Sequence, residues 1–288
     1  MPVGKYKLLS SITKGAFVKN YFIGLCAFAW YLSSCLLLHQ ELKSGDFITA
    51  GFILACTIWM YNLDRLFGDN WELVTSAFKA LSTKTVTFEK SHAKILTESL
   101  FALPALVLLF FMEWDVLTRL FLPAVVAVLY AIPVLPSGLR IRELPFVKIL
   151  AIAFVWAWLG SFLCTGTWYL HTYLLFAERF LFIFAITIPF DLRDLRPDEQ
   201  KGIVTVPAKT GKRRALVLAR AALFLAIGLM IVGYMNGDSF YLVRAATTLV
   251  AIGIVERWHP ERKWHYYLFF LDGCILLEAM AIFAQYSI

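Results

Sequence analysis

The sequence predicts an all-α membrane protein, one integral membrane domain over residues 1–288 that crosses the bilayer nine times. Of the 288 residues, 60% are hydrophobic and only 16% are charged, and the mean hydropathy is +0.71. A soluble domain is typically about half apolar and a quarter charged. The apolar residues also gather in runs close to the roughly 20 residues that one helical span requires. Composition and run length therefore exclude an ordinary soluble domain.

Nine apolar segments follow one another along the chain, and each is expected to form one transmembrane helix. They cover residues 18–38, 47–66, 95–112, 116–134, 147–165, 172–190, 215–235, 240–256 and 265–286. No small-residue cleavage site clearly follows the first of them, so we interpret it as a retained span rather than a signal peptide.

The distribution of positive charge supports this count and predicts the orientation. With a cytoplasmic N-terminus, all of the 27 Lys and Arg residues fall in cytoplasmic segments except Lys43, Arg119, Arg179 and Arg244. Such a bias is the positive-inside rule, and a missed or extra span would destroy it. The protein is thus expected in a membrane, the inner one if bacterial. Topology and anionic lipid explain the net charge of +7, so no nucleic-acid partner is predicted.

Two long loops, at about 67–93 and 191–213, are expected to form caps on the cytoplasmic face. They follow the second and the sixth predicted span, so four spans separate them. This spacing suggests two similar four-helix halves and a ninth helix. The loops on the other face are short, which indicates that the protein works on the cytoplasmic side.

The stretch FDLRDLRPDEQKGIVTVPAKTG begins at Phe190, where the sixth apolar segment ends, and holds three aspartates. Asp191, Asp194 and Asp198 are spaced by three and then four, which places them on one face of a continuous helix. Pro197 is expected to end that helix near 193–196 and to start a new turn in first position.

Clustered carboxylates repel one another unless a cation lies among them. Mg²⁺ typically takes one or two carboxylates together with phosphate oxygens. Basic side chains nearby, Arg193 and Lys201 among them, suit the same phosphate. The spacing alone is equally consistent with a solvated loop that neutralises its own charge.

The pattern D-L-R-D-x-x-x-D-x-x-x-G-x-x-T-x-P-x-x-x-G in this stretch resembles the second aspartate motif of the UbiA superfamily of intramembrane prenyltransferases. It is most similar to the menaquinone-type branch. The matching positions are Asp194, Asp198, Gly202, Thr205 and Gly211, and Asp191 stands where that branch often has Asn. The resemblance implies transfer of an isoprenoid group from an allylic diphosphate to a hydrophobic acceptor, such as a quinone precursor. It also implies that Asp191, Asp194 and Asp198 bind Mg²⁺.

The segment YAIPVLPSGLRIRELPFVK, which begins at Tyr130, is similar to the family's segment between the fourth and fifth helices. The resemblance implies that Lys148, Arg140 and Arg142 face the diphosphate, with Tyr130 nearby and Lys148 stabilising the leaving group. For Arg140 and Arg142 the positive-inside rule is an equally good explanation.

The first loop departs from the family's N-D-x-x-D-x-x-x-D pattern, because the corresponding stretch reads YNLDRLFGDNWE. Asn62 and Asp64 remain at the helix end as candidate metal ligands. Arg65 is a candidate phosphate ligand. Asp69 is one residue out of step and could reach the site only if the backbone rearranges. A second metal ion is therefore in doubt.

Two acidic residues lie within the last apolar segment. Asp272 stands eight residues from its inner end, about 12 Å along a helix, and buried carboxylates in hydrocarbon tend to be functional. It is a candidate site residue or a hydrogen-bond partner for another helix. Glu278 is expected to pair with Arg244 or Arg179.

Other functions remain open from the sequence. An isoprenoid diphosphate cyclase would ionise the same substrate without an external acceptor. A non-catalytic lipid-binding or transport protein could use the carboxylates for ion coupling. A CDP-alcohol phosphotransferase is disfavoured because its D-G-x-x-A-R pattern does not occur.

Overall fold

Long apolar helices make up the described part of the chain, and it contains no strand. The computed structural model describes residues 3–69, 100–132, 140–200, 202–235 and 240–287, with the side chains of 3–19 and 64–69 outside that description. The main helices are α1 (Val3–His39), α2 (Ser44–Asp69), α5 (Ala102–Leu109), α6 (Trp114–Ala131), α7 (Val147–Leu159), α8 (Leu170–Arg193), α11 (Lys212–Met235), α12 (Tyr241–Glu256) and α13 (Gly273–Tyr286).

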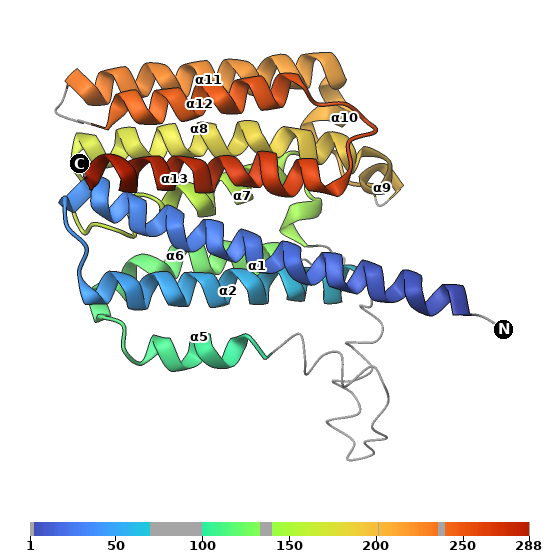
Figure 1. Ribbon diagram of the computed structural model, residues 1–288, viewed down its shortest axis with the longest axis horizontal. Coiled ribbons are helices and arrows are strands. Elements are labelled where there is room, and N and C mark those ends of the chain that lie inside the picture. The colour runs from blue at the N-terminus through green and yellow to red at the C-terminus, as the bar shows by residue number, and fades with distance from the viewer. Residues whose placement is uncertain (1–2, 70–99, 133–139, 201, 236–239, 288) are drawn as a thin grey trace.

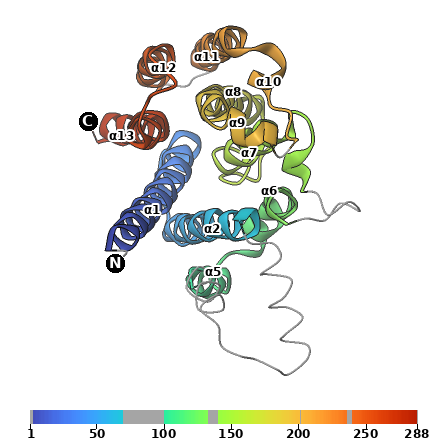
Figure 2. The ribbon, with the colours of Figure 1, turned by 90° about the vertical axis from the view of Figure 1, so that its right-hand side faces the viewer.

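The helices form a closed ring that follows the chain order, as Figure 2 shows in a view along the bundle. Each of α1, α2, α6, α7, α8, α11, α12 and α13 packs on the next, and α13 packs back on α1. Helix α5 lies on the outer side of α2. Most helices that follow one another in the chain are thus neighbours in space, as in an antiparallel helix bundle.

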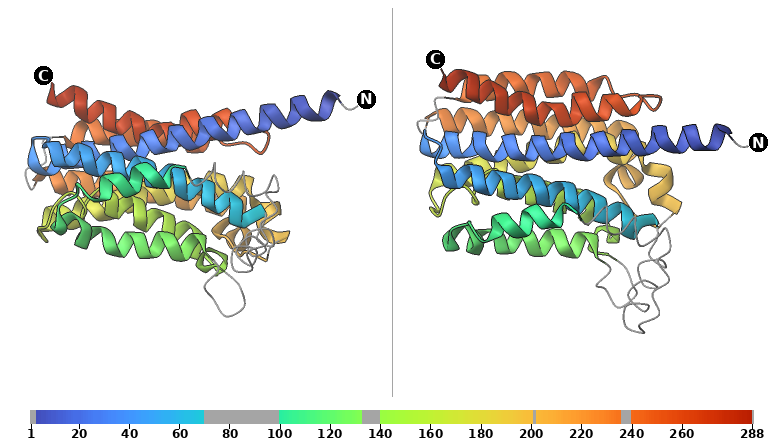
Figure 3. Two further views of the ribbon diagram at one scale, coloured as in Figure 1. Left: turned by 90° about the horizontal axis from the view of Figure 1, so that it is seen from below. Right: turned by 60° about the horizontal axis from the view of Figure 1, so that its bottom comes forward.

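The short elements gather at one end of the bundle (Figures 1 and 3). These are the single turn η1 (Ile141–Glu143), α9 (Leu195–Gln200) and α10 (Val206–Thr210). The stretch expected to form the 191–213 cap therefore folds into two short helices at the end where α1 begins. The other expected cap, at 67–93, lies outside the described residues from position 70 onward.

Six described helices are long and apolar enough to cross a membrane. They are Asn20–His39 of α1, Ser44–Leu63 of α2, α6, α8, α11 and the continuous stretch Tyr266–Tyr286. Helix α12 coincides with the predicted 240–256 but has only 16 residues, and α5 covers part of the predicted 95–112. The membrane-spanning fold is confirmed, whereas the count of nine stays a prediction.

The predicted span 147–165 is too long, because α7 ends at Leu159. Gly160 follows, and a Cβ there would lie 2.5 Å from Nε1 of Trp30 and 2.7 Å from Cδ of Arg179. The close approach of these two side chains requires glycine. The chain then turns toward α8 instead of continuing as a helix.

A buried group of charges ties three helices together inside the ring. Arg179 of α8 lies 3.4 Å from Glu278 of α13, and both side chains are fully buried. Arg244 of α12 pairs with Glu178 and lies 3.8 Å from Glu278. The guanidinium of Arg179 also stacks on Trp30 of α1, 3.7 Å from the ring centroid. The pairing of Glu278 with both arginines confirms the expectation from the sequence, and two positive and two negative charges balance.

Glu278→Gln should reduce the free energy of unfolding by about 3–5 kcal/mol, since it leaves two buried arginines facing one carboxylate. Arg179→Met combined with Glu278→Leu should recover most of that loss, because it removes a complete pair. Unfolding in mixed lipid–detergent micelles measures both. Arg220→Met is the matched control: its pair with Glu256, at 3.2 Å, is exposed, so it should cost at most about 1 kcal/mol. A double variant as unstable as Glu278→Gln would contradict this account.

Candidate active site

A cavity of about 450 Å³ lies between the helices of the ring, and residues of the short elements η1 and α9 contribute to its lining. Its lining comes from α1, α2, α6, η1, α7, α8, α9 and the segment that precedes α13. All three aspartates of the second motif line it, with Lys148, Arg142 and Tyr130. Side chains separated by more than 100 residues in the sequence therefore meet at one polar cavity in a largely apolar bundle.

Lys148 joins two of the aspartates. Its Nζ donates a hydrogen bond to Oδ2 of Asp198 at 2.7 Å and lies 3.0 Å from Oδ1 of Asp191. Asp191 is 1% exposed and Asp198 6% exposed. A buried carboxylate is costly unless a cation compensates it, and here one ammonium serves both.

The backbone explains how Lys148 reaches this position. Phe146, directly before α7, adopts a left-handed conformation with φ 65°. Its N–H donates to the carbonyl of Val204 at 3.0 Å. This bond ties the start of α7 to the chain just after α9, and so places Lys148 beside Asp198.

The remaining residues of the motif shape the backbone around the aspartates. Gly202 and Gly211 have φ values of 72° and 81°, which glycine adopts at little cost. The hydroxyl of Thr205 accepts a hydrogen bond from the N–H of Ala208, and Pro207 lies in the first turn of α10. The Gly, Thr, Pro and Gly positions of the motif thus correspond to two turns and one capped helix, α10. These elements hold α9 against α8.

Asp194 has a different partner from the other two aspartates. Helix α8 ends at Arg193, as expected, and Asp194 is its C-cap. Nε and Nη2 of Arg193 donate to the two Asp194 oxygens at 2.7 Å each. The new turn begins at Leu195 instead of Pro197, since the N–H of Asp198 donates to the carbonyl of Asp194. Because the helix is interrupted, the three carboxylates share a cavity but not one helical face.

The side chains of the two arginines in the 130–148 segment point to different places. Arg142 lines the cavity, and its guanidinium lies 5.2 Å from the centroid of the Tyr130 ring. Arg140 is buried and turns to Glu143, to which its backbone N–H, Nε and Nη2 all donate. Burial opposes ionisation of Glu143, but these hydrogen bonds outweigh it and lower its pKa. The structure therefore brings Arg142, and not Arg140, to the cavity.

The first loop contributes less to the described site. Asn62 is buried in α2, about two turns before its end at Asp69, and forms a hydrogen bond with Asn20 of α1. The side chains of Asp64, Arg65 and Asp69, in the last turns of α2, lie outside the described residues, as does Lys201. Their expected roles stay predictions.

The residues present fit a magnesium ion that takes a few ligands from the protein and the others from phosphate oxygens and water. Neither oxygen of Asp191 receives a hydrogen bond from the described residues, although both are buried. Asp198 approaches the same ammonium, so one cation can serve both carboxylates. Among the described residues no group of three or more His, Cys, Asp or Glu is placed to hold a metal. Two carboxylates with phosphate oxygens and water match the usual coordination of Mg²⁺.

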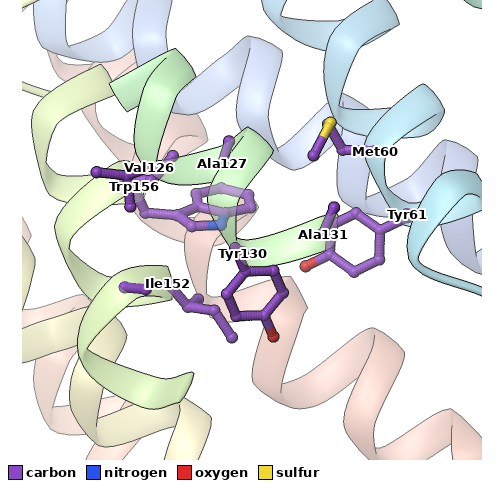
Figure 4. A pocket seen from close by; sticks show the side chains of 10 residues that line it. Met60, Tyr61, Val126, Ala127, Tyr130, Ala131, Ile152 and Trp156 are labelled. Atoms are coloured by element: carbon purple, nitrogen blue, oxygen red, sulfur yellow. The ribbon is translucent and has the colours of Figure 1, made fainter. Parts of the chain in front are cut away.

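Two apolar cavities continue from the polar one. The first, about 140 Å³, shares Tyr61, Tyr130 and Ile152 with the polar cavity. Figure 4 shows Tyr61 of α2 and the α7 residues Ile152 and Trp156 on opposite sides of it, with Tyr130 of α6 between them. The second, about 300 Å³, shares five residues with the first and reaches Phe52 of α2. From Tyr61 to Phe52 is nine residues, about 13 Å along α2. An apolar chain attached to a polar head would fit this path.

Several lining residues were not predicted from the sequence. They are Asn20, Tyr61, Thr187, Trp264 and Tyr267. Asn20 carried a usable signal, because an amide at the inner end of an apolar segment needs a partner. The others are ordinary residues of membrane helices, and only the packing shows that they face the cavity.

A sequence profile of the UbiA prenyltransferase family matches residues 79–272, two thirds of the chain. The chain belongs to the UbiA prenyltransferase family. With six helices apolar enough to span a membrane, this UbiA protein is an integral membrane protein. A search of curated protein sequences found no match.

Solved structures of UbiA homologues share the fold of the whole chain. A homologue from Archaeoglobus fulgidus bound to GPP and Mg²⁺ has a TM-score of 0.66 at 13% identity, covering 95% of this chain and all of its own. The apo structure of a homologue from Aeropyrum pernix K1 has a TM-score of 0.63 at 14% identity, covering 92% and 97%. A structure described as digeranylgeranylglyceryl phosphate synthase in membranes has a TM-score of 0.58 at 15% identity, covering 94% and 98%. At these identities the likeness is one of fold.

Lys148→Met should destabilise the UbiA protein by about 3–5 kcal/mol without metal, because two buried carboxylates lose their shared cation. Millimolar Mg²⁺ should then raise the melting temperature of the variant more than that of the parent, since binding to the folded state alone is stabilising. Thermal unfolding in lipid nanodiscs with and without Mg²⁺ measures both effects. Lys209→Met, at an exposed position, is the control. Equal losses in the two variants, or no response to Mg²⁺, would show that Lys148 does not compensate the carboxylates.

Proposed function

We propose that this protein is a Mg²⁺-dependent prenyltransferase, which moves an isoprenoid group from an allylic diphosphate to a hydrophobic acceptor and releases diphosphate. The observation that supports this most directly is Lys148 between Asp191 and Asp198, at the wall of a polar cavity that continues into an apolar path. The homologue from Archaeoglobus fulgidus bound to GPP and Mg²⁺, and its complex with DMAPP and Mg²⁺, agree with such a substrate.

Asp191 and Asp198 would hold the metal, with Asp194 as a third candidate once it is released from Arg193. Asn62 and Asp64 at the end of α2 are the candidates from the first loop. Bound Mg²⁺ supplies Lewis acidity and positive charge to the diphosphate oxygens. The first loop keeps one carboxylate, Asp64, near the helix end, whereas the family pattern has two aspartates at four-residue intervals. This difference suggests that the α8–α9 side provides most of the metal ligands.

Lys148 and Arg142 would stabilise the leaving group. With Asp191 and Asp198 holding a metal, the ammonium of Lys148 would be available to the diphosphate. The bond between the allylic carbon and the diphosphate oxygen breaks, and its electron pair leaves with the diphosphate. Fixed positive groups at the place where negative charge develops are a large term in catalysis. Arg65 and Lys201 are further candidates for the same phosphate.

The apolar path would hold the isoprenoid chain and keep water from the allylic cation. Tyr61, Tyr130 and Trp156 present rings along its first part (Figure 4), and a ring face attracts positive charge. The acceptor then attacks the allylic carbon and loses a proton. A quinone precursor or another aromatic compound is the acceptor class that the family resemblance favours.

The proposed topology follows the charge distribution. We infer nine spans in a single domain, with the N-terminus, the cap segments and the cavity on the cytoplasmic side. The described cap elements η1, α9 and α10 all lie at the end of the bundle where α1 begins (Figure 1), which agrees with this arrangement. Membrane lipid surrounds the remainder.

A cyclase is the second candidate, because it needs the same ionisation and the same apolar path. It differs in requiring no external acceptor, so acceptor dependence of the product separates the two. A transport role is less well supported: Gly202, Thr205 and Pro207 build a turn around the Lys148 site, and ion coupling alone does not require it.

Asp194→Asn and Asp198→Asn should each lower Mg²⁺-dependent diphosphate release by about a hundredfold or more, the scale on which charged groups at a reacting centre act. The assay uses purified protein in lipid and allylic diphosphates of increasing chain length, first without and then with an acceptor. Asp115→Asn, an exposed position outside the cavity, should leave the rate unchanged. Absence of release by the parent protein at every chain length would contradict the proposed function.

Ala127→Trp should shorten the isoprenoid chains that the protein accepts, because Ala127 lines both apolar cavities. The rate with a ten-carbon diphosphate should fall less than the rate with a twenty-carbon one, and the ratio of the two rates is the measurement. Leu122→Phe is the control, since that side chain is exposed on the outer face of α6. An unchanged ratio would show that the isoprenoid chain does not occupy these two apolar cavities.

A further inference from the structure

We propose that Tyr267 is a positioning residue for diphosphate binding: its ring holds the guanidinium of Arg193 at the cavity wall, where Arg193 passes from Asp194 to the diphosphate. The inference rests on the proposed prenyl transfer and adds a phosphate ligand, together with its support, to the same site. It follows from the two kinds of contact that Arg193 makes, one with a carboxylate and one with aromatic rings.

The ion pair between Arg193 and Asp194 is open to the polar cavity. Both residues line the cavity, and their side chains are 37% and 34% exposed. The side chains of Lys148 and Asp191, by contrast, are 13% and 1% exposed. Exposed ion pairs contribute little to stability, because water competes for both charges. A metal ion that binds Asp194 would therefore displace Arg193 more readily than it would displace Lys148 from Asp191.

The contact of Arg193 with two rings does not involve the carboxylate. Its guanidinium carbon lies 4.6 Å from the centroid of the Tyr267 ring and 5.2 Å from that of Phe190. The centroids of the two rings are 5.3 Å apart. The face of an aromatic ring attracts a guanidinium electrostatically, and this attraction persists when the carboxylate turns to a metal. The rings would then keep the guanidinium at the cavity wall.

Tyr267 is itself held in place by a residue outside the cavity lining. It lies in the π-helical segment η2 (Tyr266–Asp272) and is 2% exposed. Its hydroxyl accepts a hydrogen bond from Nε1 of Trp258 at 3.0 Å, and Trp258 is also buried. A buried ring with a fixed hydrogen bond has little freedom to move. Tyr267 therefore offers Arg193 a fixed surface.

The chemistry of Arg193 suits a diphosphate. Its Nε and Nη2 donate to the two oxygens of Asp194 at 2.7 Å each, and the same planar fork can bind two phosphate oxygens. Lys148 and Arg142 line the same cavity, so one diphosphate could be bound by all three cations. Asp272 lines it as well and attracts Arg193. A diphosphate carries more negative charge than this single carboxylate, so it would be the stronger partner.

The test uses inorganic pyrophosphate with Mg²⁺ as the probe, titrated calorimetrically into the protein in lipid nanodiscs. Arg193→Met should weaken pyrophosphate binding about tenfold or more, because a charge-assisted bidentate contact is lost. Tyr267→Leu should weaken it about fivefold, as expected for the loss of a cation–π contact. Tyr267→Phe keeps the ring and should stay within about twofold of the parent. Tyr234→Leu, an exposed position on α11 outside the cavity lining, is the matched control and should not change binding.

A double variant separates the positioning role from a general effect on the fold. Because Tyr267 acts through Arg193, adding Tyr267→Leu to Arg193→Met should weaken pyrophosphate binding no further. Additive losses would show that Tyr267 acts independently of Arg193, and would overturn the inference. Should Tyr267→Leu fail to fold, Phe190→Leu removes the neighbouring ring and should show the same dependence on Arg193.

Two other results would also overturn the inference. One is unchanged pyrophosphate binding by Arg193→Met, which would mean that Arg193 stays with a carboxylate, Asp194 or Asp272. The other is no pyrophosphate binding by the parent protein. Diphosphate release from allylic diphosphates, measured separately, tests the prenyl-transfer proposal. Pyrophosphate binding that depends on Arg193 and Tyr267, without any release, would reject prenyl transfer and support the roles of these two residues.

Discussion

The contact of one ammonium with two buried carboxylates is the interaction on which the site depends. Asp191 and Asp198 lie in a bundle that is otherwise apolar, and each would be costly there without a cation. Lys148 approaches both. Its position is set by the left-handed Phe146 and by the hydrogen bond from Phe146 to Val204. The same contact explains how two buried carboxylates are tolerated within the folded apolar bundle.

The three aspartates of the motif are not equivalent. Asp191 and Asp198 share Lys148, whereas Asp194 is held by Arg193 beside aromatic rings. Each carboxylate thus has a positive partner on the protein that a metal ion could replace. If a metal took the place of Lys148 or Arg193 beside the aspartates, that side chain would be free to pair with a diphosphate. The positive side chain would then change partners within the cavity.

Far from the cavity, buried charges serve the fold. Glu178 and Arg179 lie in the first half of α8, and Asp191 lies near its end. Their partners Arg244 and Glu278 come from α12 and α13, and Trp30 comes from α1. These contacts join the helices that close the ring. Helices packed in lipid gain little from the hydrophobic effect, and the ring is held instead by close packing, as at Gly160, and by paired charges.

The sequence by itself determined that the protein is helical and spans a membrane, because apolar runs of span length have no other stable form in lipid. The motif around Asp194 and Asp198 was sufficient to identify the family, and Lys148 to suggest the site. Only the tertiary structure decided which candidates meet. Arg140 turns away to Glu143, whereas Arg142 and Asp272 line the same cavity as Lys148. The physical reason is that periodicity predicts how far apart residues lie within one helix, whereas the choice of partners depends on how separate helices rotate and pack against one another.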